Sequence, residues 1–267
     1  MSKAGMTATR ELAARYAAVA NSLTAEELAL PSACEGWSVQ DLIAHASSNF
    51  QAVVEPPLAS TEPSTVPAPL AEAGMSLMVD ARRDWTSTQV LDELNGFAPG
   101  FLAAVEAMQA EPTASIEIPM SELGTYPLHS LADAFAFDIA CHLYVDLLAP
   151  TGPITRDIAP LDDEMLTPGI GWMLTGLPQM CPGVSQILDR PVGLVLTGPG
   201  GGEWTLRPGN PYFSVVPGLS EEVAGSVESD AFAFMKWGTH RALWRDHVTV
   251  TGEADYVTRV LDSINVI

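Results

Sequence analysis

The chain has 267 residues, and 47% of them are hydrophobic, which is enough to bury the core of one large domain or of two ordinary ones. Its 33 acidic residues against 12 basic ones give a formal net charge of −21. This charge repels nucleic acids and anionic lipid surfaces, so we expect neither as a partner. The three cysteines form no Cys-x-x-Cys pair, which argues against a disulfide framework and is typical of the reducing cytoplasm.

No segment is predicted to enter or cross a membrane. The first residues go directly into a charged amphipathic pattern and lack the apolar region of a secretory signal. Residues 165–188 carry no charge, but prolines and glycines interrupt them too often for a lipid-exposed helix. We therefore expect a cytoplasmic protein with buried helix and turns over this stretch.

The beginning of the chain is predicted to be helical, because apolar residues recur at intervals of three and four. The first such stripe consists of Leu12, Tyr16, Val19 and Leu23. A second helix is predicted to begin at Ser38, where Ser-Val-Gln-Asp has the form of a capping box, with Trp37 at the hydrophobic staple position. It continues through His45 to about Val54. Five prolines between residues 55 and 70 then predict a loop.

Further helical patterns cover residues 71–83, 87–110 and 128–148. We expect the second of these to be interrupted near Asn95-Gly96 and again near Pro99-Gly100. The third ends at Ala-Pro-Thr-Gly-Pro, which predicts a domain boundary. Residues 1–150 are therefore expected to form a helical domain.

The rest of the chain, residues 151–267, is predicted to be an α+β domain. After a helical patch at 160–177, residues 192–197 and 204–207 are expected to form two strands joined by a Gly-rich loop. Two more strands are predicted at 223–227 and 247–251. Each is followed by a helical pattern, at 230–243 and 254–264.

Three potential metal ligands stand out. Asp138 and His142 are four residues apart, so on a helix their side chains point the same way and can reach one ion. The neighbouring residues are apolar, and a cation would compensate the cost of burying the carboxylate among them. His45 belongs to a separate helix, and facing helices of a bundle commonly contribute ligands to one internal site. Together the three predict a metal centre with an open coordination position.

This ligand set suits Zn²⁺ with water or substrate in the remaining position, and it also suits Fe²⁺, Mn²⁺, Co²⁺ or Ni²⁺. Asp146, one turn beyond His142, is expected to accept a hydrogen bond from a ligand imidazole. An Asp and a His at this spacing also arise by chance at helix surfaces, and a single His on an amphipathic helix is usually structural. The prediction therefore depends on the combination of all three ligands.

Other reactive side chains carry weaker signals. Arg241 and Arg245 stand out in a chain with few basic residues. They are expected either to guide a carboxylate substrate to the metal or, more simply, to pair with the many acidic side chains. Cys141 is interpreted as a core residue, because its helical position turns it about 100° away from His142. Cys34, in the turn before the helix of His45, is also interpreted as structural.

The two ligand segments resemble a known family. CEGWSVQDLIAH, residues 34–45, resembles the N-terminal signature of the mycothiol-dependent maleylpyruvate isomerase family, a branch of the DinB-like metal-binding helix bundles. Asp138-Ile-Ala-Cys-His142, followed by Asp146-Leu147, is similar to the second signature of that family. The ending VTVTGEADYVTRVL resembles the small α+β sterol-carrier-like domain that many members append.

The resemblance implies that His45, Asp138 and His142 bind a divalent metal, usually zinc, in a four-helix bundle. It also implies two small-molecule ligands, a substrate and mycothiol, the low-molecular-weight thiol of actinobacteria. The metal would present the thiol as a thiolate, which either adds to an activated double bond, allows rotation and leaves, or displaces a leaving group. The first reaction is isomerisation and the second is thiol transfer.

The sequence departs from the family pattern at Asp138, where the isomerase itself is expected to have Glu. The shorter acid predicts an ion that lies closer to that helix or binds more weakly, and a subgroup with another substrate. Two other functions stay open. One is a non-catalytic carrier of an apolar ligand with a structural metal, favoured by the uncharged stretch at 165–188. The other is a metal-dependent hydrolase that uses a metal-bound water.

Overall fold

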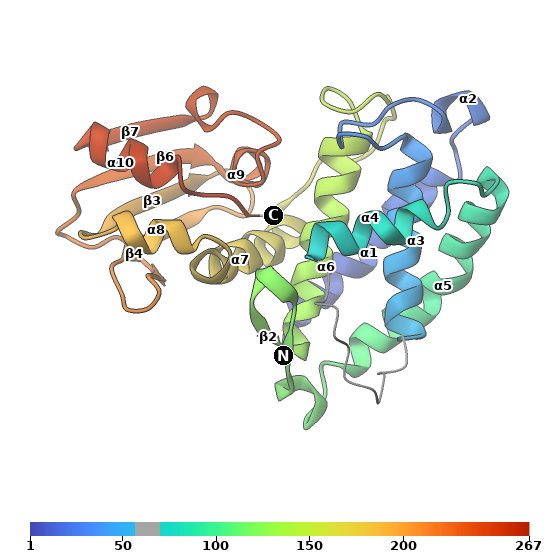
Figure 1. Ribbon diagram of the computed structural model, residues 1–267, viewed down its shortest axis with the longest axis horizontal. Helices are drawn as coiled ribbons and strands as arrows, with labels where there is room; N and C mark the ends of the chain where they lie inside the picture. Colours follow the sequence, from blue (N-terminus) through green and yellow to red (C-terminus); the bar gives the residue numbers. More distant parts are fainter. Residues whose placement is uncertain (57–69, 267) are drawn as a thin grey trace. The chain divides into compact units, whose positions relative to one another are not determined.

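In the computed structural model, the described residues, 1–56 and 70–266, form two compact units (Figure 1). The first unit comprises residues 1–121 and 125–159, and the second comprises residues 122–124 and the described chain from 160 onward. The first is largely helical and the second contains a sheet, which confirms the predicted fold class. Residues 57–69, which belong to the segment predicted as a Pro-rich loop, lie outside the described residues.

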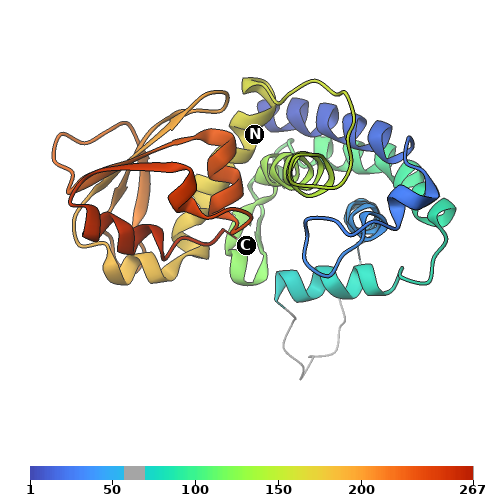
Figure 2. The same ribbon diagram turned by 90° about the horizontal axis from the view of Figure 1, so that it is seen from above.

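The first unit is a helix bundle with a short two-stranded hairpin. Its helices α1 and α6 pack against each other, and α3 packs against α5. Figure 2, which looks nearly along the axes of α3 and α6, shows α1 and α4 on opposite sides of this pair. The elements of the unit are α1 (Lys3–Ala20), α2 (Ala25–Leu28), α3 (Val39–Val54), α4 (Ala71–Asp80), α5 (Ser87–Ala107), β1 (Glu117–Pro119), β2 (Thr125–Pro127) and α6 (Leu131–Cys141).

Helix α3 begins where the capping box predicts. The Ser38 side chain accepts a hydrogen bond from the backbone N–H of Asp41 at 3.1 Å, and the Asp41 carboxylate accepts one from the N–H of Ser38 at 2.8 Å. These bonds satisfy two of the backbone donors that a helix start leaves without partners. Phe50, on the buried side of α3, stacks on Phe101 of α5 with ring centroids 4.1 Å apart. The cap and this contact fix the position of the helix that carries His45.

Helix α5 is continuous, so the predicted interruptions near Asn95-Gly96 and Pro99-Gly100 are wrong. Pro99 removes one hydrogen bond from the ladder of the helix, but it lies on the exposed side, where water can reach the carbonyl that loses its partner. Gly100 faces Val54 of α3 so closely that a Cβ atom would lie 3.1 Å from a Val54 methyl group. Gly100 therefore allows α3 and α5 to pack closely, and it does not interrupt α5.

The helix predicted over 128–148 changes its geometry along its length. Residues Leu128–Ser130 form a 3₁₀ turn, α6 follows, and residues His142–Leu147 form a π-helical turn, η4. The change from α to π geometry falls at His142, one of the predicted ligands. The sequence did not predict this wider turn, which is a form that often occurs at functional sites.

The second unit has a five-stranded sheet with the strand order β5-β4-β3-β6-β7, in which only β3 and β6 are parallel neighbours. Helices α9 and α10 pack against β6. The elements are α7 (Asp163–Met180), α8 (Pro182–Ile187), β3 (Val192–Thr197), β4 (Gly202–Arg207), β5 (Ser214–Pro217), β6 (Gly225–Asp230), α9 (Ala231–Gly238), β7 (Val248–Gly252) and α10 (Ala254–Leu261).

The sequence predicted the strands β3, β4, β6 and β7 and the hairpin between β3 and β4, but it missed β5. It also predicted a helix from 230 to 243, whereas α9 ends at Gly238. Arg241 therefore lies beyond the end of α9, and Arg245 lies in a separate 3₁₀ turn, Trp244–Asp246. Across the described residues, no helix has the length and apolar character that a membrane span needs. The domain boundary at 150 and the likeness of this unit to a sterol carrier stay predictions.

Replacing Ser38 with Ala is expected to lower the free energy of unfolding by about 1 kcal/mol, because the start of α3 loses a capping acceptor. Ser38→Asn, which keeps a capping oxygen, should retain most of the stability. Urea unfolding followed by circular dichroism measures both values. Equal losses in the two variants would show that the cap does not determine the stability of α3.

Candidate metal centre

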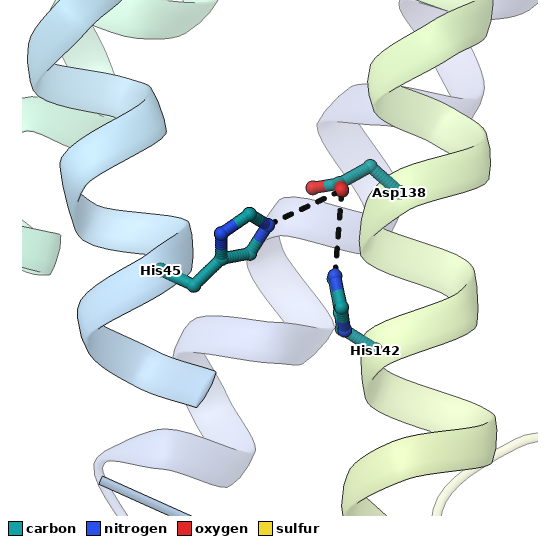
Figure 3. A group of neighbouring side chains, drawn as sticks. All are labelled: His45, Asp138 and His142. Carbon is teal, nitrogen blue, oxygen red and sulfur yellow. Dashed lines mark hydrogen bonds and ion pairs between the residues drawn. The ribbon is translucent and has the colours of Figure 1, made fainter. Parts of the chain in front are cut away.

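The structure brings His45 of α3 together with Asp138 of α6 and His142, the first residue of η4 (Figure 3). The Nε2 atom of His45 lies 3.4 Å from one carboxylate oxygen of Asp138, and the Nε2 atom of His142 lies 3.5 Å from the same oxygen. The ligand atoms of all three residues lie within 4.8 Å of one another. Asp138 and His142 follow His45 by 93 and 97 positions in the sequence, and the fold brings them into one cluster with it.

The spacing of these atoms fits a metal better than it fits hydrogen bonds. Charge-assisted N–H···O bonds are usually about 2.7–2.9 Å long, so both contacts with Asp138 are long for that interaction. Ligand bonds of about 2.0–2.1 Å arranged as a tetrahedron would place neighbouring ligand atoms roughly 3.3 Å apart. Both imidazoles are buried and Asp138 is half-buried, so the donors are held in place and one side stays accessible. The donor set therefore suits a divalent ion such as Zn²⁺.

Asp138 is held in its charged form. Burial by itself would raise the pKa of this carboxyl group, but the imidazoles of His45 and His142 outweigh that effect and hold the pKa well below its usual range. A carboxylate that stays ionised at neutral pH is ready to bind a cation. The bundle therefore carries the negative charge of Asp138 at the position where a metal would bind.

His142 is oriented by a second carboxylate. Its Nδ1 atom lies 2.8 Å from Asp146, whose side chain is fully buried within η4. Burial by itself would lower the pKa of His142, but the carboxylates of Asp138 and Asp146 outweigh burial and raise this pKa to about 9. The bond to Asp146 fixes a proton on Nδ1 and turns Nε2 toward Asp138 and His45. Asp146 thus accepts a hydrogen bond from His142, and its support of a metal ligand stays a prediction.

Two residues near the cluster were not assigned a functional role from the sequence. The ring of Trp37 stacks on that of His142, with centroids 6.4 Å apart, and lies tilted against His45 at 5.2 Å. The amide nitrogen of Asn49 lies 3.2 Å from His45 Nε2. The position of Asn49, one turn after His45, is the signal that could have identified it. For Trp37, the sequence indicated only its position in the hydrophobic staple before α3.

The remaining candidates lie outside the cluster. Arg245 pairs with Asp262 at 3.0 Å and covers the ring of Trp244, which is the simpler of the two roles expected for it. Arg241 lies in the same unit, and substrate binding by either arginine stays a prediction. Cys141 is buried and Cys34 is partly buried, and neither belongs to the ligand cluster.

The family model for the mycothiol maleylpyruvate isomerase N-terminal domain matches residues 9–143, which include His45, Asp138 and His142. The chain belongs to this family. Its fold is also that of two crystal structures, those of the mycothiol-dependent maleylpyruvate isomerase and of a single-residue variant of it. Each is 16% identical over 92% of this chain and 91% of the other, with TM-scores of 0.58 and 0.57 respectively. No curated protein matches the chain.

In this member of the mycothiol maleylpyruvate isomerase family, we expect metal binding to release protons. Because the pKa of His142, about 9 without metal, lies above its ordinary value, the protonated imidazole stabilises the metal-free fold below about pH 6.5. That contribution is lost as the pH rises through about 9. An ion that binds near pH 7 must displace this proton, so about one proton per ion should be released.

Calorimetric titration with Zn²⁺ in buffers of different ionisation enthalpy measures this number. The release should decline toward zero as the pH passes through about 9, where His142 is already neutral. Binding near pH 7 with no proton release would contradict the assignment of His142 as a ligand.

Asp146→Asn is expected to weaken metal binding by roughly 10- to 100-fold, because the imidazole of His142 loses a charged partner that orients it and raises its basicity. Asp133→Asn is the matched control, since Asp133 lies on α6 but bonds to Ser2 outside the cluster. Competition with a chelator measures both affinities. The role of Asp146 is refuted if the two variants bind metal equally well.

Proposed function

We propose that this chain is a zinc-dependent enzyme that uses mycothiol as cofactor or co-substrate for cis-trans isomerisation of a small activated substrate, or for thiol transfer to one. The observation that carries the proposal is the convergence of two imidazole Nε2 atoms on one oxygen of Asp138. Membership of the mycothiol maleylpyruvate isomerase family supports mycothiol as the thiol and isomerisation as the first reaction to test.

The residues of the chain have separate tasks in this proposal. His45, Asp138 and His142 would hold the ion, and Asp146 would keep the proton of His142 on Nδ1. A divalent ion in this position lowers the pKa of a thiol that binds to it and supplies a thiolate nucleophile at neutral pH. Trp37 packs against both imidazoles.

The single net charge of the ligand set favours this chemistry. Two neutral imidazoles and one carboxylate leave a divalent ion with a net positive charge, which attracts a thiolate. A set with more carboxylates would neutralise the ion and weaken that attraction. Asp138 is half-buried, so its carboxylate is not sealed off from solvent.

His142→Ala is expected to abolish stoichiometric zinc binding, and with it the effect of mycothiol on stability. In the wild-type protein, mycothiol at 100 times its dissociation constant should add about 2.7 kcal/mol of stability, and only when zinc is present. Elemental analysis measures the metal, and thermal unfolding with and without mycothiol measures the protection. His247→Ala, a histidine of the second unit, is the control and should behave like the wild type.

Two outcomes would refute the proposal. One is a full complement of zinc in the His142→Ala protein, and the other is thermal protection by mycothiol in the absence of metal. Turnover of esters or amides without any thiol would favour the hydrolase instead. Co-purified lipid with no thiol-dependent turnover would favour the carrier.

A further inference from the structure

Asn49 lies at the edge of the ligand cluster and has no other role in the fold that the described residues show. It follows His45 by one turn of α3 and is half-buried. Its amide nitrogen is 3.2 Å from His45 Nε2, the same atom that lies 3.4 Å from Asp138. Within the described part of the chain, this is the contact that its side-chain amide makes.

This contact and a metal use the same lone pair. An amide nitrogen donates and does not accept, so the contact is favourable when Nε2 of His45 presents its lone pair, which is also the form that binds a metal. An ion bound to Nε2 therefore takes the acceptor away from Asn49. A half-buried amide that loses its acceptor is destabilised unless it finds another one.

A ligand in the open position of an ion held by His45 Nε2 would offer the amide a new acceptor, because the amide lies beside that atom. A bond of roughly 2.1 Å to the ion, added to the 3.2 Å separation, keeps the amide nitrogen within about 5.3 Å of the metal. Trp37 precedes α3 and covers the imidazoles from the other end of His45.

We propose that Asn49 donates a hydrogen bond to the sulfur of the thiol bound at this centre, and that it thereby contributes to thiol affinity and fixes the direction of the sulfur. The inference rests on the proposed thiol-dependent function. A neutral amide suits this task, because it stabilises a thiolate without neutralising it. A carboxylate in the same place would repel the sulfur, and an ammonium group would repel the metal.

The test compares Asn49→Ala and Asn49→Asp with the wild-type protein, all loaded with zinc. Gln40→Ala is the matched control, because Gln40 is another amide of α3 and donates to Trp85 away from the cluster. Calorimetry measures the dissociation constant for mycothiol, and chelator competition measures zinc affinity. We expect Asn49→Ala to bind mycothiol on the order of ten-fold more weakly, which is the loss of one hydrogen bond to a charged acceptor. It should bind zinc no more weakly than the wild type, because no amide then competes for the lone pair of His45.

Asn49→Asp keeps the shape of the side chain and should weaken mycothiol binding further, while it binds zinc at least as tightly. Gln40→Ala should match the wild type in both measurements. Equal mycothiol affinity in the wild type and in Asn49→Ala overturns the inference and leaves the proposed function intact. A loss of zinc in Asn49→Ala also overturns it, because Asn49 would then be a ligand. A zinc-loaded wild type that does not bind mycothiol overturns the proposed function itself.

Discussion

The centre of the helix bundle depends on the compensation of the negative charge of Asp138, a half-buried carboxylate. Asp138 projects from an α6 whose other residues are mostly apolar and buried, and a carboxylate in such surroundings is strongly unfavourable without a partner. The two imidazoles supply that partner, since both direct Nε2 to the same oxygen. Either a proton on an imidazole or a cation between the three groups satisfies the charge. The same constraint that stabilises the fold thus creates the ligand set.

The segment before α3 and the turn after α6 hold the cluster from the same end. The backbone N–H of Ala33 donates to the carbonyl of Asp146 at 3.0 Å, which ties the loop before α3 to η4. That loop leads directly to Trp37, whose ring covers both imidazoles, and to the cap at Ser38. Asp146 therefore acts twice, through its carboxylate on His142 and through its carbonyl on the loop. The positions of His45 and His142 are coupled by backbone as well as by side chains.

Local signals were sufficient to predict the start of α3 and the proximity of Asp138 to His142. The capping box placed the start of α3 at Ser38, and the four-residue interval placed Asp138 and His142 on one face. No local pattern indicates which helices face each other, so His45 was joined to that pair by the general rule that facing helices of a bundle share an internal site. The resemblance to a family supported the same grouping.

The features that were missed depend on packing. Pro99 was expected to interrupt α5, but its exposed position lets water replace the missing hydrogen bond, and exposure cannot be read from one residue. The strand β5 is short and ends in a proline, so its pattern alone does not distinguish it from a loop. Trp37 stacks on His142, which belongs to η4, a segment far from Trp37 in the sequence.

The π-helical turn explains how one segment places Asp138, His142 and Asp146 in one row. In an α-helix, a residue four positions on lies about 40° further round the axis, so Asp146 would lie about 80° from Asp138 and begin to leave the face of the ligands. The wider turn that starts at His142 rotates the following residues back. Asp146 consequently stays in line, buried and 2.8 Å from His142 Nδ1. A departure from α geometry at His142 is therefore what keeps Asp138, His142 and Asp146 in one row.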